Sequence, residues 1–158
     1  MDIWDAHFDT DIRKNFKVIL VNKDLYDVTF VITEKKLYAH KVILAANSEV
    51  FRAMFTTEMK EQGNDTVKIV DIDATVFEVF LTYMYTGCVT EVGKVVDELI
   101  VVADKYQVMS LKQLCECYMS DHIDVDTAIT YLLKAYHLSC TKLQKKCIDF
   151  IRINTYIL

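Results

Sequence analysis

The chain has 158 residues, is 53% hydrophobic and 26% charged, and carries a formal net charge of −5. This length is enough to bury a core without disulfides or metals, and the interleaved acidic and basic residues lack the Lys/Arg clusters of a nucleic-acid surface. No apolar run approaches the roughly 18 residues of a transmembrane helix, and the acidic start MDIWDAHFDTD does not resemble a signal peptide.

The first predicted element is an amphipathic helix over residues 5–20, with charged residues on the face opposite its apolar stripe. The stripe consists of Phe8, Ile12, Phe16, Ile19 and Leu20. Two interpretations stay open: the helix folds back onto its own core, or a second subunit buries it. Residues 26–33 (YDVTFVIT) and 36–39 (KLYA) are rich in β-branched and aromatic residues and predict a hairpin.

A helical period begins at His40, whose ring we expect to be partly buried and hydrogen-bonded to nearby backbone. Ser48 is placed to cap a second helix, EVFRAMF. Residues 66–70 (TVKIV) predict a strand, and Asp73 then caps a helix that Gly87 ends.

The rest of the chain predicts at least four helices. They cover residues 94–106, a segment capped by Ser110, residues 126–138 and residues 141–152. The helix over 126–138 brings an apolar stripe together: Ile129, Leu132, Leu133 and Tyr136. A small sheet with many helices is an α+β layout.

Catalytic and metal-binding patterns are not found in the sequence. The three Gly stand apart, so no Gly-rich phosphate loop exists, and no nucleophile elbow is found. Cys115 and Cys117 point about 200° apart on a helix and cannot share a metal ion. The five Cys lack regular spacing and indicate reduced thiols in the cytoplasm or nucleus. We therefore expect a binding module rather than an enzyme, with no metal and no cofactor.

The polar segment TTEMKEQGND (56–65) contains one large apolar residue, Met59, between Glu58 and Glu61. Met adapts well to protein surfaces, so a contact with a partner is one interpretation. The other is a side chain that folds back over the core.

The segment YDVTFVITEKKLYAHKVILAANSEVFRAMFTTEMKE resembles the signature of the BTB/POZ domain. The likeness continues through VFEVFLTYMYTG (76–87) and VVDELIVVADKYQVMSLKQLCE (95–116), and it covers nearly the whole chain. It is strongest to speckle-type POZ, armadillo-repeat and kelch-like proteins. It implies a BTB/POZ domain over residues 1–122, and a 3-box or the start of a BACK domain over residues 123–158.

The resemblance also implies partners and sites. Such domains are usually homodimers, and the positions that match their dimer interface are Ile12, Phe16, Ile19 and Ile43. Many bind the N-terminal domain of cullin 3 through a hydrophobic-x-Glu triplet, which Met59-Lys60-Glu61 matches. Tyr106 falls in a helical region that commonly lies at the same interface.

The expected function is that of a substrate adaptor of a cullin 3 RING ubiquitin ligase, in the cytoplasm or nucleus. Its substrate would bind a region outside this chain, and neither nucleic acid nor membrane is an expected partner. The alternative is a self-association module of a transcriptional regulator or scaffold that does not bind cullin.

Overall fold

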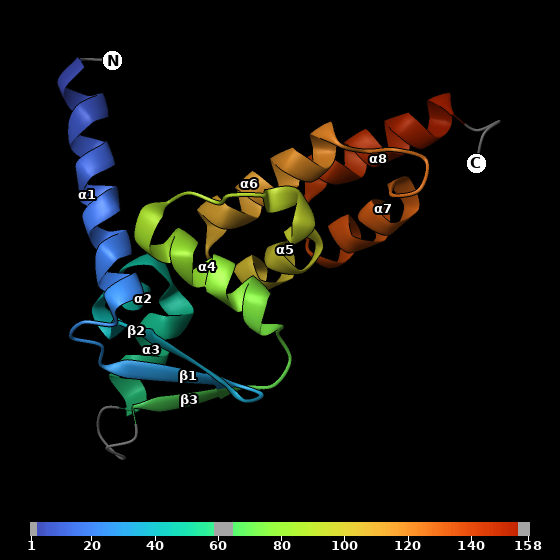
Figure 1. Cartoon of the computed structure of the whole chain (residues 1–158). Helices are drawn as coiled ribbons and strands as arrows, with labels where there is room; N and C mark the ends of the chain where they lie inside the picture. The colour runs from blue at the N-terminus through green and yellow to red at the C-terminus, as the bar shows by residue number, and fades with distance from the viewer. Residues whose placement is uncertain (1–2, 59–64, 155–158) are drawn as a thin grey trace. The chain divides into compact units, whose positions relative to one another are not determined.

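The computed structural model describes the backbone of residues 3–58 and 65–154 and the side chains of residues 12–56 and 65–154 (Figure 1). Its contacts divide the chain into two compact units, Met1–Thr90 and Glu91–Leu158. The first unit contains the described sheet and four helices, and the second is helical. This is the predicted α+β class.

The sheet of the first unit has three strands in the order β2-β1-β3, which are β1 (Val28–Ile32), β2 (Lys35–Ala39) and β3 (Thr66–Ile69). Strands β1 and β2 form the predicted antiparallel hairpin, in which Phe30 lies opposite Leu37. Strand β3 joins the other edge of β1 in parallel, with Val67 opposite Phe30. Buried and partly exposed residues alternate along β1, as expected for a strand with one face in the core.

Four helices complete this unit: α1 (Ile3–Asn22), α2 (Lys41–Asn47), α3 (Glu49–Glu58) and α4 (Ala74–Thr86). Phe30 on β1 contacts Phe51 on α3 and Phe77 on α4, with ring centroids 5.7 and 5.0 Å apart. These rings and Phe80 have no exposed surface. Each fully buried Phe contributes about 1.5–3 kcal/mol, so this aromatic cluster fixes α3 and α4 on the sheet.

The predicted helix caps of this unit are confirmed. The Ser48 hydroxyl accepts a hydrogen bond from the Phe51 amide at 3.2 Å. The Asp73 carboxylate accepts one from the Thr75 amide at 2.7 Å, and it begins α4. Gly87 ends α4 with a φ of 65°, a left-handed conformation that a residue without Cβ adopts readily.

His40 has the structural role that the sequence predicted. Its side chain is 9% exposed, its Nε2 lies 2.6 Å from the Asp24 carbonyl, and its Nδ1 lies 2.7 Å from the Tyr85 hydroxyl. That hydroxyl also accepts a hydrogen bond from the His40 amide at 2.8 Å. A proton on Nε2 satisfies every group, because Nδ1 then accepts from the hydroxyl. Burial raises the pKa of Tyr85 to about 12, so the hydroxyl keeps its proton at neutral pH.

The second unit contains the 3-10 turn η1 (Val92–Lys94) and four helices: α5 (Val96–Lys105), α6 (Met109–Asp121), α7 (Ala128–His137) and α8 (Thr141–Ile153). Helix α6 packs against α5 and α8, and α7 packs against α8. Leu99, Leu111 and Leu143 are fully buried there.

The prediction that Ser110 caps the sixth helix is wrong. Helix α6 begins at Met109 and its N-cap is Val108, two residues before Ser110. The Val108 amide donates to the Ala103 carbonyl at 2.8 Å and ends α5. Its own carbonyl accepts from the Lys112 amide at 3.0 Å and starts α6. One residue therefore serves both helices, and Ser110 lies in the first turn.

Three of the four residues in the predicted apolar stripe of α7 are exposed, and the fourth, Leu132, is half-buried. Ile129, Leu133 and Tyr136 are 55%, 58% and 58% exposed. The buried side of α7 consists of Ala128, Tyr131 and Ala135. The periodicity identified residues that share a face, but smaller residues form the packed face.

We predict that Tyr85→Phe lowers the free energy of unfolding by about 1–3 kcal/mol, because the buried His40 amide and ring nitrogen lose their partner. Urea unfolding at pH 7 measures the change. Tyr83→Phe is the matched control on α4, and its effect should stay below about 0.5 kcal/mol. Equal effects of the two substitutions would show that the hydroxyl contributes nothing specific.

Candidate functional site

The Met59-Lys60-Glu61 triplet lies between the end of α3 and the start of β3, outside the described residues. The two elements that carry this segment are themselves well fixed. Phe55, near the end of α3, is 5% exposed and stacks on Phe51 at a centroid distance of 5.6 Å. The prediction that Met59 and Glu61 contact a partner stays a prediction.

Asp65 holds the far end of the same segment. Its carbonyl accepts a hydrogen bond from the Thr29 amide at 2.7 Å, next to the parallel pairing of β1 and β3. Its carboxylate lies 2.5 Å from the Lys41 ammonium, at the start of α2. Asp65 is therefore held to the sheet and to α2.

The predicted dimer residues lie on α1 and α2. Ile12 and Phe16 are 45% and 39% exposed, while Ile19 on α1 and Ile43 on α2 are half-buried. Val18 on α1 is also exposed. Ile12 and Phe16 are four residues apart and share one face of α1, and exposed apolar side chains on one helix face are typical of a protein–protein contact. The assignment of these residues to a dimer interface stays a prediction.

Tyr106 follows α5 as its C-cap and is 4% exposed. Its amide donates to the Val102 carbonyl at 3.0 Å, and the Lys105 ammonium lies 5.6 Å from its ring centroid. Nearly all of its surface is already covered within this chain. Its predicted contact with cullin stays a prediction.

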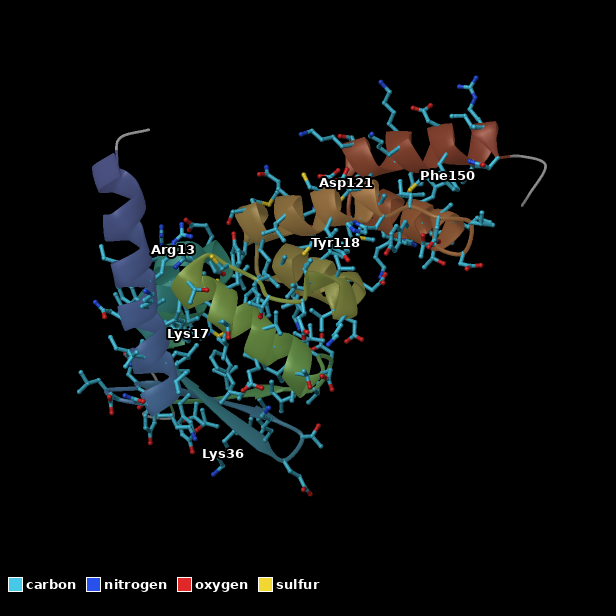
Figure 2. All side chains as sticks on the ribbon, turned by 45° about the horizontal axis from the view of Figure 1, so that its top comes forward. Arg13, Lys17, Lys36, Tyr118, Asp121 and Phe150 are labelled. Carbon is cyan, nitrogen blue, oxygen red and sulfur yellow. The ribbon has the colours of Figure 1, made fainter. Side chains whose placement is uncertain are left out.

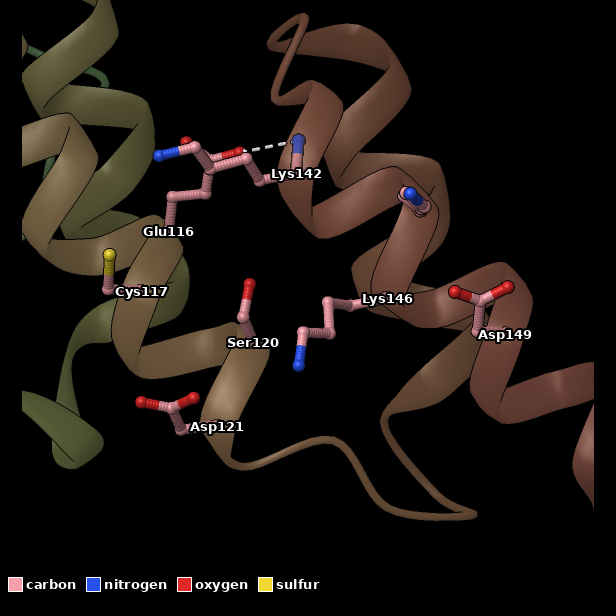
Figure 3. Close-up of a pocket in the computed structure, with 8 residues that line it drawn as sticks. Glu116, Cys117, Ser120, Asp121, Lys142, Lys146 and Asp149 are labelled. Carbon is pink, nitrogen blue, oxygen red and sulfur yellow. Dashed lines mark hydrogen bonds between the residues drawn. The ribbon is translucent and has the colours of Figure 1, made fainter.

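A cleft of about 380 Å³ lies between α6 and α8 (Figure 3). Its charged lining is balanced between Glu116, Asp121 and Asp149 and the lysines Lys142, Lys145 and Lys146. Glu116 also has a structural role, because its carboxylate accepts hydrogen bonds from the amides of Lys142 and Leu143 at 3.1 and 3.2 Å. This arrangement caps the N-terminus of α8.

A second cleft separates α1 from the C-terminal end of α4, and sequence reasoning missed it. Its described lining is basic or hydroxyl-bearing, apart from the thiol of Cys88. The signal was present in the sequence, because Arg13, Lys14 and Lys17 share the polar side of the first helix. Nothing in the periodicity showed that this side faces another helix.

The five cysteines form two groups. Cys88 and Cys117 are exposed, whereas Cys115, Cys140 and Cys147 are buried. Burial raises the pKa of Cys115 to about 12, and it raises the pKa values of Cys140 and Cys147. Cys115 and Cys117 thus lie on opposite sides of α6. Across residues 12–56 and 65–154, three potential metal ligands never gather at one place.

Within the described helices, none has the length and apolarity needed to cross a lipid bilayer.

A small three-stranded sheet joined to a group of helices, with an apolar face exposed on the first helix, defines a class of α+β interaction modules. The model of the BTB/POZ domain matches residues 16–123. The chain belongs to the BTB/POZ family. The assignment of residues 123–158 to a 3-box or BACK extension stays a prediction.

The mouse (Mus musculus) TD and POZ domain-containing protein 3 is 37% identical over 130 residues, which are 81% of this chain and 36% of that protein. The chain thus spans about a third of the length of this relative. The solved BTB domain of zebrafish PATZ1 aligns with a TM-score of 0.63 and 21% identity, over 73% of this chain and 94% of that domain. That likeness establishes the fold.

BTB/POZ domains are protein-interaction modules that self-associate and bind partners, and the family is not a known enzyme family. This agrees with the expectation of a binding module.

We predict that iodoacetamide at pH 8 alkylates Cys88 and Cys117 quickly and the three buried cysteines only after unfolding. The buried thiols are shielded from the reagent, and their raised pKa values keep them protonated. Peptide mass spectrometry with and without urea measures the sites. Fast labelling of Cys115 in the folded chain would contradict the burial described here.

Proposed function

We propose that this chain is a homodimeric substrate-adaptor subunit of a cullin 3 RING ubiquitin ligase, acting in the cytoplasm or nucleus. The observation that carries the proposal is the Met59-Lys60-Glu61 triplet, placed directly after α3 in a BTB/POZ chain. The substrate would bind a region outside this chain.

The proposed contact combines an apolar anchor with a polar neighbour, a common arrangement of interface hot spots. Full burial of Met59 would contribute about 1.5–3 kcal/mol to binding. Glu61 would orient the contact by accepting hydrogen bonds from the cullin or from the backbone of its own segment. The described residues on either side of the triplet are held in place, Phe55 by stacking on Phe51 and Asp65 by the Thr29 amide and the Lys41 ammonium.

The exposed apolar face of α7 also supports a partner in the predicted 3-box region. Ile129, Leu133 and Tyr136 lie on one side of this helix, and each is more than half exposed. An isolated chain gains nothing from three large side chains in water at helical spacing. A protein partner that covers them would bury apolar area on a preformed helix.

We expect Met59→Asp and Glu61→Lys each to weaken binding of the cullin 3 N-terminal domain by at least about tenfold, because the anchor and its polar neighbour are lost. Isothermal titration calorimetry measures the affinity. Lys60→Ala, at the variable position of the triplet, is the matched control and should bind like the parent chain.

Parent binding that all three substitutions leave unchanged would refute this assignment of the contact. A parent chain that is dimeric but does not bind cullin would favour the alternative, a self-association module without a ligase role.

We expect the double substitution Ile12→Asp with Phe16→Asp to convert a dimer into a monomer, because it places two carboxylates in the proposed apolar contact. Light scattering measures the molar mass, and circular dichroism tests whether the chain stays folded. Lys14→Asp also places a carboxylate on α1, about 170° from the centre of the face formed by Ile12, Phe16 and Ile19 by helical geometry. Lys14→Asp should leave the dimer intact. If the variant with both Ile12→Asp and Phe16→Asp is still a folded dimer, the proposed role of α1 is refuted.

A further inference from the structure

The cleft between α1 and the C-terminal end of α4 has a volume of about 300 Å³. Figure 2 shows Arg13 and Lys17 on the side of α1 that faces α4. Helix α1 contributes Arg13, Lys14 and Lys17, helix α4 contributes Thr82 and Thr86, and the following segment contributes Cys88 and Thr90. The described lining thus contains three cations and no carboxylate.

Helix dipoles alone do not account for this charge. The C-terminus of α4 carries a partial charge of about −0.5, which nearby cations stabilise. Lys14 and Lys17 by themselves exceed that charge, and neither forms an ion pair with a described carboxylate. Like charges on neighbouring helical turns also repel each other. The local positive charge of Lys14 and Lys17 therefore favours an anion beside this face of α1.

Two carbonyl groups in the last turns of α4 accept hydrogen bonds from nearby residues of the same chain. The Thr86 hydroxyl donates to the Thr82 carbonyl at 2.7 Å, and the Gly87 amide donates to the Tyr83 carbonyl at 2.7 Å. The lysines are not needed to satisfy these groups. Both side chains are exposed and line the cleft, so a ligand can approach them from solvent.

Arg13 lies at the side of the cleft formed by the segment after α4. Its Nη1 is 3.3 Å from the Cys88 sulfur, which places the guanidinium beside that segment. A guanidinium is a planar fork of donors that matches the geometry of phosphate oxygens. Lys14, the residue after Arg13, and Lys17, about one turn further along α1, add compact charges.

We propose that this cleft is a binding site for a phosphorylated side chain on a partner protein. Three cations suit a phosphate group, whose charge at pH 7 is about −1.5 to −2, better than a single carboxylate. The net charge of −5 on the chain repels an extended polyanion such as nucleic acid. A single phosphate on a peptide responds mainly to the local positive field of the cleft.

The site is compatible with the proposed dimer and independent of cullin binding. With 100° per residue, the cationic face of α1 lies about 140° from the face formed by Ile12, Phe16 and Ile19. One face can bind a second copy while the other remains open. Beyond the proposed ligase role, this site would give the chain a second kind of partner, a protein with a phosphorylated side chain.

Titration of the folded chain with inorganic phosphate and with the peptide acetyl-Gly-phosphoserine-Gly-amide tests the proposal. Both should shift the NMR signals of the Cys88 and Thr90 amides, while the matched Ser peptide should not and the Glu peptide should bind more weakly. Lys14→Glu and Lys17→Glu should each weaken phosphopeptide binding about tenfold. Lys36→Glu changes the net charge equally at an exposed site on β2 and should have no effect.

Alkylation gives a second measurement on the parent chain, which stays decisive if a lysine variant unfolds. Bound phosphopeptide should slow the reaction of Cys88 with iodoacetamide, while Cys117, which lies outside this cleft, serves as the internal control. Lys17→Arg should retain binding.

Four results would overturn the proposal. The first two are an absence of NMR shifts at the Cys88 and Thr90 amides and equal protection of Cys88 and Cys117 from alkylation by iodoacetamide. The third is a loss of phosphopeptide affinity in Lys36→Glu as large as in Lys17→Glu. The fourth is tighter binding of single-stranded RNA or phosphatidylserine vesicles than of the phosphopeptide. None of these measurements involves cullin, so failure here is distinguishable from failure of the ligase proposal.

Discussion

Burial of the aromatic cluster on β1, α3 and α4 is the interaction on which the first unit depends. Phe30, Phe51, Phe77 and Phe80 have no exposed surface, and their rings join the sheet to both helices. The segment that carries Met59 begins where α3 leaves this cluster. The cleft beside α1 forms where α4 ends. Both proposed binding surfaces are thus positioned by the same core, and neither contributes a residue to it.

Helix α1 turns its basic side toward α4 and leaves apolar residues exposed. In a helix that completes the core of its own chain, the apolar stripe faces inward. Here Ile12 and Phe16 remain in water, while the lining of the cleft includes Lys14 and Lys17. The aliphatic parts of long basic side chains can pack on a neighbouring helix while their charged ends reach solvent. This orientation supports the view that α1 is built for two contacts outside its own core.

Local sequence signals predicted much of the fold, since each one depends on neighbours in the chain. Enrichment in β-branched and aromatic residues located the hairpin, and Ser48, Asp73 and Gly87 marked helix ends as the structure has them. Ser110 failed as a cap because Val108 already joined α5 to α6. A side chain that can cap a helix does not set the start of that helix when a backbone turn just before it has already set the start.

The orientation of amphipathic helices was the part that periodicity could not supply. A helical period shows which residues share a face, but not which element covers that face. In α7 the stripe containing Ile129 and Leu133 is exposed, and Ala128 and Ala135 permit close packing on the other side. In α1, periodicity likewise did not show that the basic face lies beside α4, so the cationic cleft was not predicted. The sequence alone was therefore least informative about site residues whose roles depend on tertiary contacts or on contacts with partners.

The two faces of α1 connect the proposed dimer with the proposed phosphate site. A dimer formed through Ile12, Phe16 and Ile19 would carry two copies of the cleft, one on each first helix. A partner with two phosphorylated side chains on a linker of suitable length would then bind both copies. The second binding event becomes intramolecular, and its effective concentration is in the millimolar range for a short flexible linker. A contact that is weak in one chain would in this way gain avidity from self-association, with no additional contact in either cleft.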